Sequence, residues 1–146
     1  MIRNSTTMKM KIAALFTLLV LAGCDQTSET TQANNAPTKH KSELALAEGS
    51  TLMLNAAHLK SYAKPNSAGN LQMHEFSYPA VDKMAENDVY MHMKTAGYTR
   101  KVISSGNAPY KVQYYKKDTP VVGGIYTMVN RNDKTETIAT IYWQGK

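Results

Sequence analysis

The chain has 146 residues, a formal net charge of +6 and a single cysteine. This length suits one small domain with an extension and is too short for two well-packed domains. A single thiol excludes an internal disulfide, so the folded part must be stabilised by its core alone.

The N-terminal residues contain the three parts of a secretory signal. Lys9 and Lys11 form a basic flank, residues 12–21 are apolar, and two small residues precede Cys24. A transmembrane helix needs roughly 20 apolar residues, and this run is only about half as long. A buried core helix is the second alternative to a secretory signal, after a transmembrane helix. It would place both lysines beside a segment that has no polar face.

The segment Leu21-Ala22-Gly23-Cys24 closely resembles the lipobox of bacterial lipoproteins. The resemblance covers residues 8–25 and implies cleavage before Cys24, a diacylglycerol on its sulfur, and usually an acyl chain such as palmitate on the new N-terminus. It therefore implies a lipid-anchored protein of the cell envelope, whose thiol is neither a nucleophile nor a metal ligand. Asp25 resembles the signal that retains enteric-type lipoproteins in the inner membrane facing the periplasm, with the outer membrane as the alternative.

Removal of the signal (residues 1–23) also changes the charge. Arg3, Lys9 and Lys11 are lost, which leaves 14 basic against 11 acidic residues and a net charge of +3. This small excess fits contact with anionic headgroups or with an acidic partner. It is too weak to indicate nucleic-acid binding, and an exported protein would not normally meet nucleic acid.

Residues 25–41 are polar and contain no large apolar side chain, so they cannot contribute to a core. We interpret residues 24–49 as the lipidated cysteine and a flexible tether. Random-coil scaling gives the polar stretch a reach of roughly 20–25 Å. Residues 42–48 could form a helical turn or two, and the folded domain is predicted to span residues 50–146.

The first part of that domain has a mixed pattern. Residues 51–63 could form a short strand that runs into a helix, or one helix. Residues 64–70 form a loop by composition, and residues 71–76 form a brief strand. The clearest helix spans residues 79–96, where apolar side chains recur at spacings of four and three: Val81, Ala85, Val89, Met93 and Ala96.

After Gly97 the pattern changes to the alternation of strands. Alternation places Tyr110, Val112 and Tyr114 on one face of their strand. One helix followed by sequential strands predicts an α+β fold with one main helix packed on a four-stranded antiparallel β-meander. The four predicted strands are residues 98–103, 110–116, 125–129 and 135–143.

No motif typical of a catalytic or nucleotide-binding site occurs in the chain. The helix carries Asp82, Glu86 and Asp88, which we expect to be solvated helix charges and not a catalytic pair. The sequence therefore predicts a protein that is not an enzyme and that needs no cofactor.

The segment Met91-His92-Met93 contains thioether and imidazole groups, which are ligands that suit Cu(I). Consecutive helical residues point in directions about 100° apart, so these three side chains cannot converge on one ion. We expect packing roles for both methionines and a hydrogen-bonded histidine between them, with no metal site here.

The chain contains nine tyrosines, several of them on predicted strands. Because neighbouring strand residues face opposite ways, Tyr114 and Tyr115 cannot both lie in the core. Tyrosine and arginine are enriched at recognition surfaces, although tyrosine is also an ordinary strand former. We predict Tyr114, Tyr115, Tyr126 and Arg131 as contacts for a partner protein.

Together these features favour a lipid-tethered binding module that acts through protein–protein contact. The partner would be an envelope assembly complex, or an enzyme or toxin that the protein inhibits. Lysozyme inhibitors and immunity proteins are often envelope lipoproteins of this size, but no motif of either family is present. The alternative is a small-ligand or copper carrier of the cell envelope.

Overall fold

The computed structural model describes residues 40–106 and 109–145. Cys24, Asp25 and most of the predicted tether lie outside the described residues. Within these residues there are one helix and eight strands. The helix is α1 (Asp82–Thr95), and the strands are β1 (Ser42–Ala45), β2 (Thr51–Leu54), β3 (Ala57–Asn66), β4 (Gly69–Tyr78), β5 (Thr99–Ser104), β6 (Tyr110–Tyr115), β7 (Val122–Arg131) and β8 (Lys134–Gln144).

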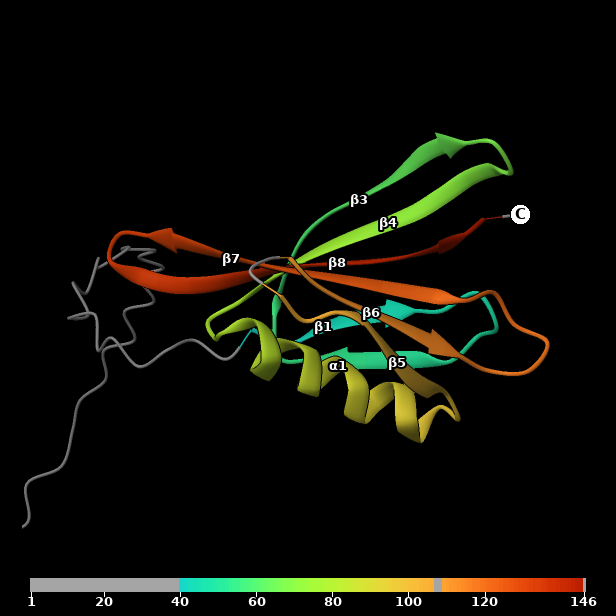
Figure 1. Cartoon of the computed structure of the whole chain (residues 1–146), viewed down its shortest axis with the longest axis horizontal. Helices are drawn as coiled ribbons and strands as arrows, with labels where there is room; N and C mark the ends of the chain where they lie inside the picture. Colours follow the sequence, from blue (N-terminus) through green and yellow to red (C-terminus); the bar gives the residue numbers. More distant parts are fainter. Residues whose placement is uncertain (1–39, 107–108, 146) are drawn as a thin grey trace, which may run out of the picture. The chain divides into compact units, whose positions relative to one another are not determined.

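Six of the strands form one antiparallel sheet in the order β3-β4-β8-β7-β6-β5 (Figure 1). The four strands that follow the helix are consecutive neighbours, as a meander requires, so the α+β class agrees with the prediction. The predicted strand number is wrong, because the β3–β4 hairpin adds two strands beside β8. Among the described strands, β1 and β2 pair only with each other.

The structure also corrects the predictions for residues 42–70. Residues 42–48 do not form a helical turn, because β1 occupies their first half, and residues 51–63 form β2 and most of β3 with no helix. Leu44 and Leu46 are buried in the core, so the folded part extends back to Ser42 and does not begin at residue 50. Most of the predicted loop belongs to the two strands of the β3–β4 hairpin.

One face of the large sheet, which we call the covered face, packs against α1 and the β1–β2 hairpin. Figure 1 shows both elements on the same side of the long strands. The helix buries Ala85, Val89 and Met93, which confirms three members of the predicted apolar stripe, whereas Val81 stays exposed at the helix N-cap. The sheet contributes these buried side chains to the same core: Phe76, Tyr78, Tyr110, Val112, Tyr114, Val122, Tyr126, Ala139, Ile141 and Trp143.

The C-terminal end of α1 is fixed by Gly97, which has the left-handed φ of 88°. The backbone N–H of Tyr98 donates to the Met93 carbonyl over 2.9 Å, and that of Gly97 donates to Lys94 over 3.0 Å. This hydrogen-bond pattern ends a helix and turns the chain toward the next element. It directs the chain into β5 at the edge of the sheet.

No helix in the described part of the chain is long and apolar enough to cross a membrane.

Gly124 of β7 shows how tightly the core is packed. A Cβ at this position would lie 2.8 Å from Cε2 of Tyr126, on the same face of the same strand. The Tyr126 ring is fully buried, and its hydroxyl is hydrogen-bonded to that of Tyr114, so it has no free space to move into. The position therefore requires glycine.

We expect the substitution Gly124→Ala to lower the free energy of unfolding by about 1–3 kcal/mol, as overpacking of a core does. Gly106→Ala is the matched control, because a Cβ there would meet nothing within 4 Å. Urea unfolding followed by circular dichroism measures both variants. Equal stability of the two would contradict this description of the packing around Tyr126.

Candidate functional site

The structure separates the four residues predicted to contact a partner. Tyr114 and Tyr126 are 0% and 1% exposed, so a surface role for these two is wrong. Tyr115 and Arg131 are exposed, but they lie far apart, because Tyr115 is beside the start of β7 and Arg131 ends that strand. Alternation along a strand fixes which residues share a face but not which face is covered.

The two buried tyrosines belong to a hydrogen-bonded network. The Tyr114 hydroxyl donates to Oε1 of Glu86 over 3.0 Å and lies 2.9 Å from the Tyr126 hydroxyl. Arg100 donates from Nη1 to Oε2 of Glu86 over 2.9 Å, and its guanidinium lies over the Tyr90 ring at 4.3 Å from the ring centre. The network links α1 to β5, β6 and β7.

Glu86 is therefore not a solvated helix charge. It is only 2% exposed, and burial raises its pKa, while Tyr114 and Arg100 act to lower it. Glu86 lies three residues before Val89 and seven before Met93, so it is on the same side of the helix as the apolar stripe. This spacing is the sequence pattern that could have predicted its burial, although a charged residue is not normally assigned to a core. Because both carboxylate oxygens have partners, the network is explained by packing, and it holds the helix on the sheet.

Asp88 is also anchored. Its carboxylate accepts hydrogen bonds from the backbone and side-chain nitrogens of Asn55, over 2.9 and 2.6 Å, and from the Tyr78 hydroxyl over 3.1 Å. Burial raises the pKa of Tyr78, and the Asp88 charge raises it further. These bonds attach α1 to the link between β2 and β3, so Asp88 also has a structural role.

The methionine and histidine segment of α1 does not form a ligand cluster. Met91 is 53% exposed and Met93 is fully buried, so their thioethers point to different sides of the helix. This placement agrees with the expectation that Met91, His92 and Met93 do not converge. The expected packing role is confirmed for Met93 and wrong for Met91, whose side chain is exposed. Among the described residues, no three His, Cys, Asp or Glu side chains come together as a metal site would need.

The second face of the large sheet is the candidate interface, and we call it the open face. No helix or second sheet from residues 40–106 and 109–145 packs on it. Strand pairing aligns its side chains in rows across the strands. One row contains Tyr62, Met73, Tyr142, Gly123, Gln113 and Lys101, and the next contains Lys60, Glu75, Thr140, Ile125, Lys111 and Ser104.

The centre of the open face is aromatic and aliphatic. Met73 lies between Tyr62 and Tyr142 in its row and is largely shielded from solvent by its neighbours. The Tyr142 ring occupies the space above Gly123, where any Cβ would collide with it. Ile125 extends this apolar area into the next row. The open face thus presents large side chains that are held by rigid strands.

The two ends of the open face differ in charge. At the β3 end, Lys60 pairs with Glu75 over 3.4 Å, and the Tyr62 hydroxyl donates to the same carboxylate over 2.9 Å. At the β5 end, Lys101 and Lys111 have no carboxylate within 4.0 Å among the described residues. The β5 end is therefore basic and free to meet negative charge. Tyr115 also belongs to this face, at the same end.

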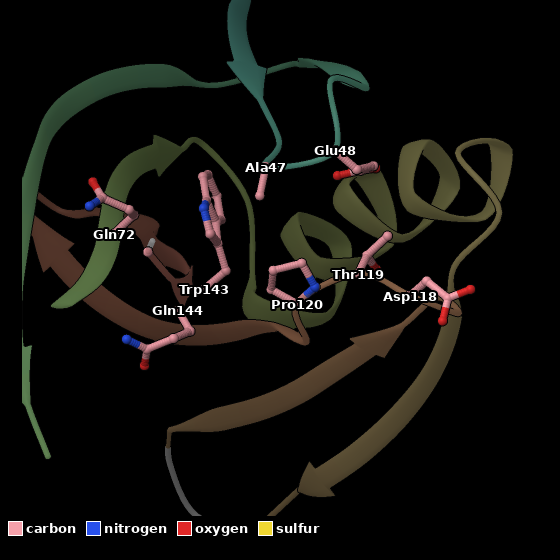
Figure 2. A pocket seen from close by; sticks show the side chains of 9 residues that line it. Ala47, Glu48, Gln72, Asp118, Thr119, Pro120, Trp143 and Gln144 are labelled. Carbon is pink, nitrogen blue, oxygen red and sulfur yellow. The ribbon is translucent and has the colours of Figure 1, made fainter. Parts of the chain in front are cut away.

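A pocket of about 480 Å³ lies at one end of the covered face. Figure 2 shows Trp143 and Gln72 on one side of it, Thr119 and Asp118 on the other, and Pro120 between them. An aromatic wall with a few polar groups is a typical lining for a small-molecule site. The remaining lining residues are Ala47, Glu48, Gln144 and Gly145.

Glu48 lies at the rim of this pocket. Burial raises its pKa, but its own backbone amide, the Tyr98 and Ser50 hydroxyls and Lys116 outweigh burial, so the pKa is lowered overall. The Lys116 Nζ lies 3.6 Å from Oε1. Both carboxylate oxygens are shielded from solvent, and neither accepts a hydrogen bond of ordinary geometry from the described residues.

Comparison with protein-family models, with curated proteins and with solved structures finds no match for this chain.

The placement of the tyrosines predicts that two alanine substitutions change the free energy of unfolding by very different amounts. Tyr126→Ala should lower the free energy of unfolding by about 3–5 kcal/mol, because it removes a buried ring and a partner of Tyr114. Tyr115→Ala should change it by less than about 0.5 kcal/mol, because this side chain lies on the surface. Thermal and urea unfolding measure both. Similar stabilities for the two variants would contradict the assignment of the covered and open faces.

Proposed function

We propose that the protein is a lipid-anchored, non-enzymatic binding module of the cell envelope, and that it binds an acidic surface of a partner protein through its open face. The observation that carries the proposal is the exposure of a broad sheet face with an apolar centre and a basic end. Faces of this kind on folded proteins mark interaction sites.

The anchor part of the proposal rests on the sequence. Cys24 follows the apolar run at the position where the lipobox resemblance implies lipidation, and polar residues 25–41 separate it from the folded part. A tether of this length would let the domain reach partners a short distance from the membrane. Asp25 favours the inner membrane, facing the periplasm, with the outer membrane as the alternative.

The partner's chemistry follows from the charges of the open face. Lys101 and Lys111 have no paired carboxylate among the described residues, so the β5 end favours a negatively charged surface. Tyr62 and Tyr142 offer a large contact area and lose little side-chain entropy on binding, because a tyrosine side chain is rigid and has only two χ angles. Such a surface suits an envelope assembly factor, or an inhibitor or immunity-type protein that covers its target.

A small-ligand carrier is the second candidate function, and the pocket beside Trp143 favours it. The pocket is large enough for a small organic molecule. Copper carriage through Met91 and His92 has no support from the geometry, because Met93 is buried away from them.

Photo-crosslinking in living cells tests the partner. A photoreactive amino acid in place of Thr140, at the centre of the open face, should give an adduct with another envelope protein in the full-length, anchored chain. The same amino acid in place of Lys83, which is exposed on α1, is the matched control and should give none. The paired substitution Lys101→Glu and Lys111→Glu should reduce the Thr140 adduct without lowering the melting temperature.

Three outcomes would overturn the open-face interface. These are no adduct from Thr140, equal adducts from Thr140 and Lys83, and an adduct with the mass of two copies of this chain. A Thr140 adduct that is insensitive to the lysine reversals would contradict the acidic partner.

The anchor is tested separately by intact-mass analysis. We expect the natural protein to begin at Cys24 and to carry the mass of a diacylglycerol and an acyl chain. Cys24→Ser should remain unlipidated and uncleaved, so its mass should include the signal residues that precede position 24 and lack the diacylglycerol and the acyl chain. A natural product with an unmodified N-terminus and a free thiol would rule out the lipid anchor, whatever the result for the open face.

A further inference from the structure

We propose that His58 of β3 and His74 of β4 form a binding site for a divalent transition-metal ion, with Cu²⁺ as the ion that binds most tightly. The site lies on the opposite side of the hairpin from the open face, and it does not depend on the proposed function.

A β-bulge brings the two histidines together. Residues three apart on a regular strand point to opposite faces, so His58 and Ser61 would be separated on a regular β3. The register shifts between His58 and Lys60, and the extra residue places His58 and Ser61 on the same face. Ser61 is directly opposite His74 on β4.

The imidazole nitrogens converge on one point. Nε2 of His58 lies 2.9 Å from the Ser61 hydroxyl oxygen, and Nδ1 of His74 lies 2.7 Å from the same oxygen. Two ring nitrogens from adjacent strands are therefore directed at one small polar volume. The Ser61 hydroxyl oxygen occupies the point of convergence, so a metal ion would bind beside it. Small rotations of the two rings would direct both nitrogen lone pairs at that ion, and the serine hydroxyl or water would supply oxygen ligands.

Both rings are held in place by aromatic side chains. The His74 ring stacks on Trp143, with 4.7 Å between the ring centres and 18° between the planes. The His58 ring lies 5.3 Å from the ring of Phe76. Nε2 of His74 is buried and has no hydrogen-bond partner, so Nδ1 is the nitrogen that this histidine presents to the site. Such preorganisation lowers the cost of binding.

The donor set selects the class of metal. Two imidazoles with hydroxyl or water oxygens are nitrogen and oxygen ligands, which suit Cu²⁺, Ni²⁺ and Zn²⁺ and lack the sulfur that favours Cu(I). For such a site the order of affinities places Cu²⁺ first. This site differs from the Met91-His92-Met93 segment in its residues and in its place in the fold, because it lies on β3 and β4 and not on α1. It also differs in the oxidation state of the copper ion that its ligands suit.

The stacked tryptophan provides the measurement. Trp143 is the single tryptophan of the chain, and Cu²⁺ bound at His74 would quench its fluorescence. Copper(II) chloride is titrated into the full-length protein in detergent and a weakly coordinating buffer. We expect saturable quenching with one ion per chain, and recovery of the fluorescence when excess Zn²⁺, which does not quench, displaces the copper.

The variants separate this site from the other histidines of the chain. His58→Gln should weaken binding by more than about tenfold, because it removes a ligand, and loss of even a hydrogen-bonding partner of a ligand typically costs about that much. This exposed residue is chosen because its replacement should leave the fold intact, which circular dichroism and the melting temperature verify. The paired substitution His40→Gln and His92→Gln is the control and should bind copper as the natural protein does.

Quenching that does not saturate, or that is the same in His58→Gln and the natural protein, would overturn the site. Loss of quenching in the His40 and His92 control would show that copper binds elsewhere and would overturn it equally. If His58→Gln proves unfolded, Ser61→Ala, which keeps both imidazoles, should still show saturable quenching. Absence of quenching in a folded Ser61→Ala protein would contradict the convergence of the two rings on one ion.

Discussion

The buried carboxylate of Glu86 is the interaction on which the arrangement of this domain depends. It receives hydrogen bonds from Tyr114 and Arg100, and through Tyr114 it reaches Tyr126. A buried carboxylate is costly unless its hydrogen-bonding partners are present, so this network favours one position of α1 on the sheet. The three small or medium apolar residues of the helix would not define that position alone.

The position of α1 on the sheet explains why one face of the sheet is buried and the other is exposed. Because α1 and the β1–β2 hairpin both lie on the covered face, the side chains of the opposite face have no described element above them. Tyr62, Met73 and Tyr142 therefore form an apolar centre between a paired β3 end and an unpaired basic β5 end. The same constraint that completes the core on one side produces the candidate interface on the other.

The sequence predicts the elements that have a clear hydrophobic periodicity, and it does not predict features that periodicity does not encode. The helix and the four strands after it have strong patterns, and all five form, although β7 (Val122–Arg131) is longer than its predicted residues 125–129. Strand β3 is exposed on both sides and has no apolar alternation, so its residues carry no pattern that predicts a strand. Alternation grouped Tyr114 with Tyr110 correctly but could not show that this group faces the core. Glu86 was hidden by its charge, and the pairing of His58 with His74 depends on a bulge that no local pattern indicates.

The β3–β4 hairpin is the part of the domain where the two proposed activities come closest. Alternation along its strands places Tyr62 and Met73 on the open face, whereas Ser61 and His74 point to the other side of the same sheet. A partner on the open face and a metal ion at the two histidines would therefore not compete for space. An ion that links β3 to β4 would cross-link two strands that are otherwise joined by backbone pairing, the Lys60–Glu75 pair and a few side-chain hydrogen bonds. Because β3 has no strand from the described residues on its outer side, such a link would stiffen the end of the open face that carries Tyr62. The two sites would then be coupled through the hairpin.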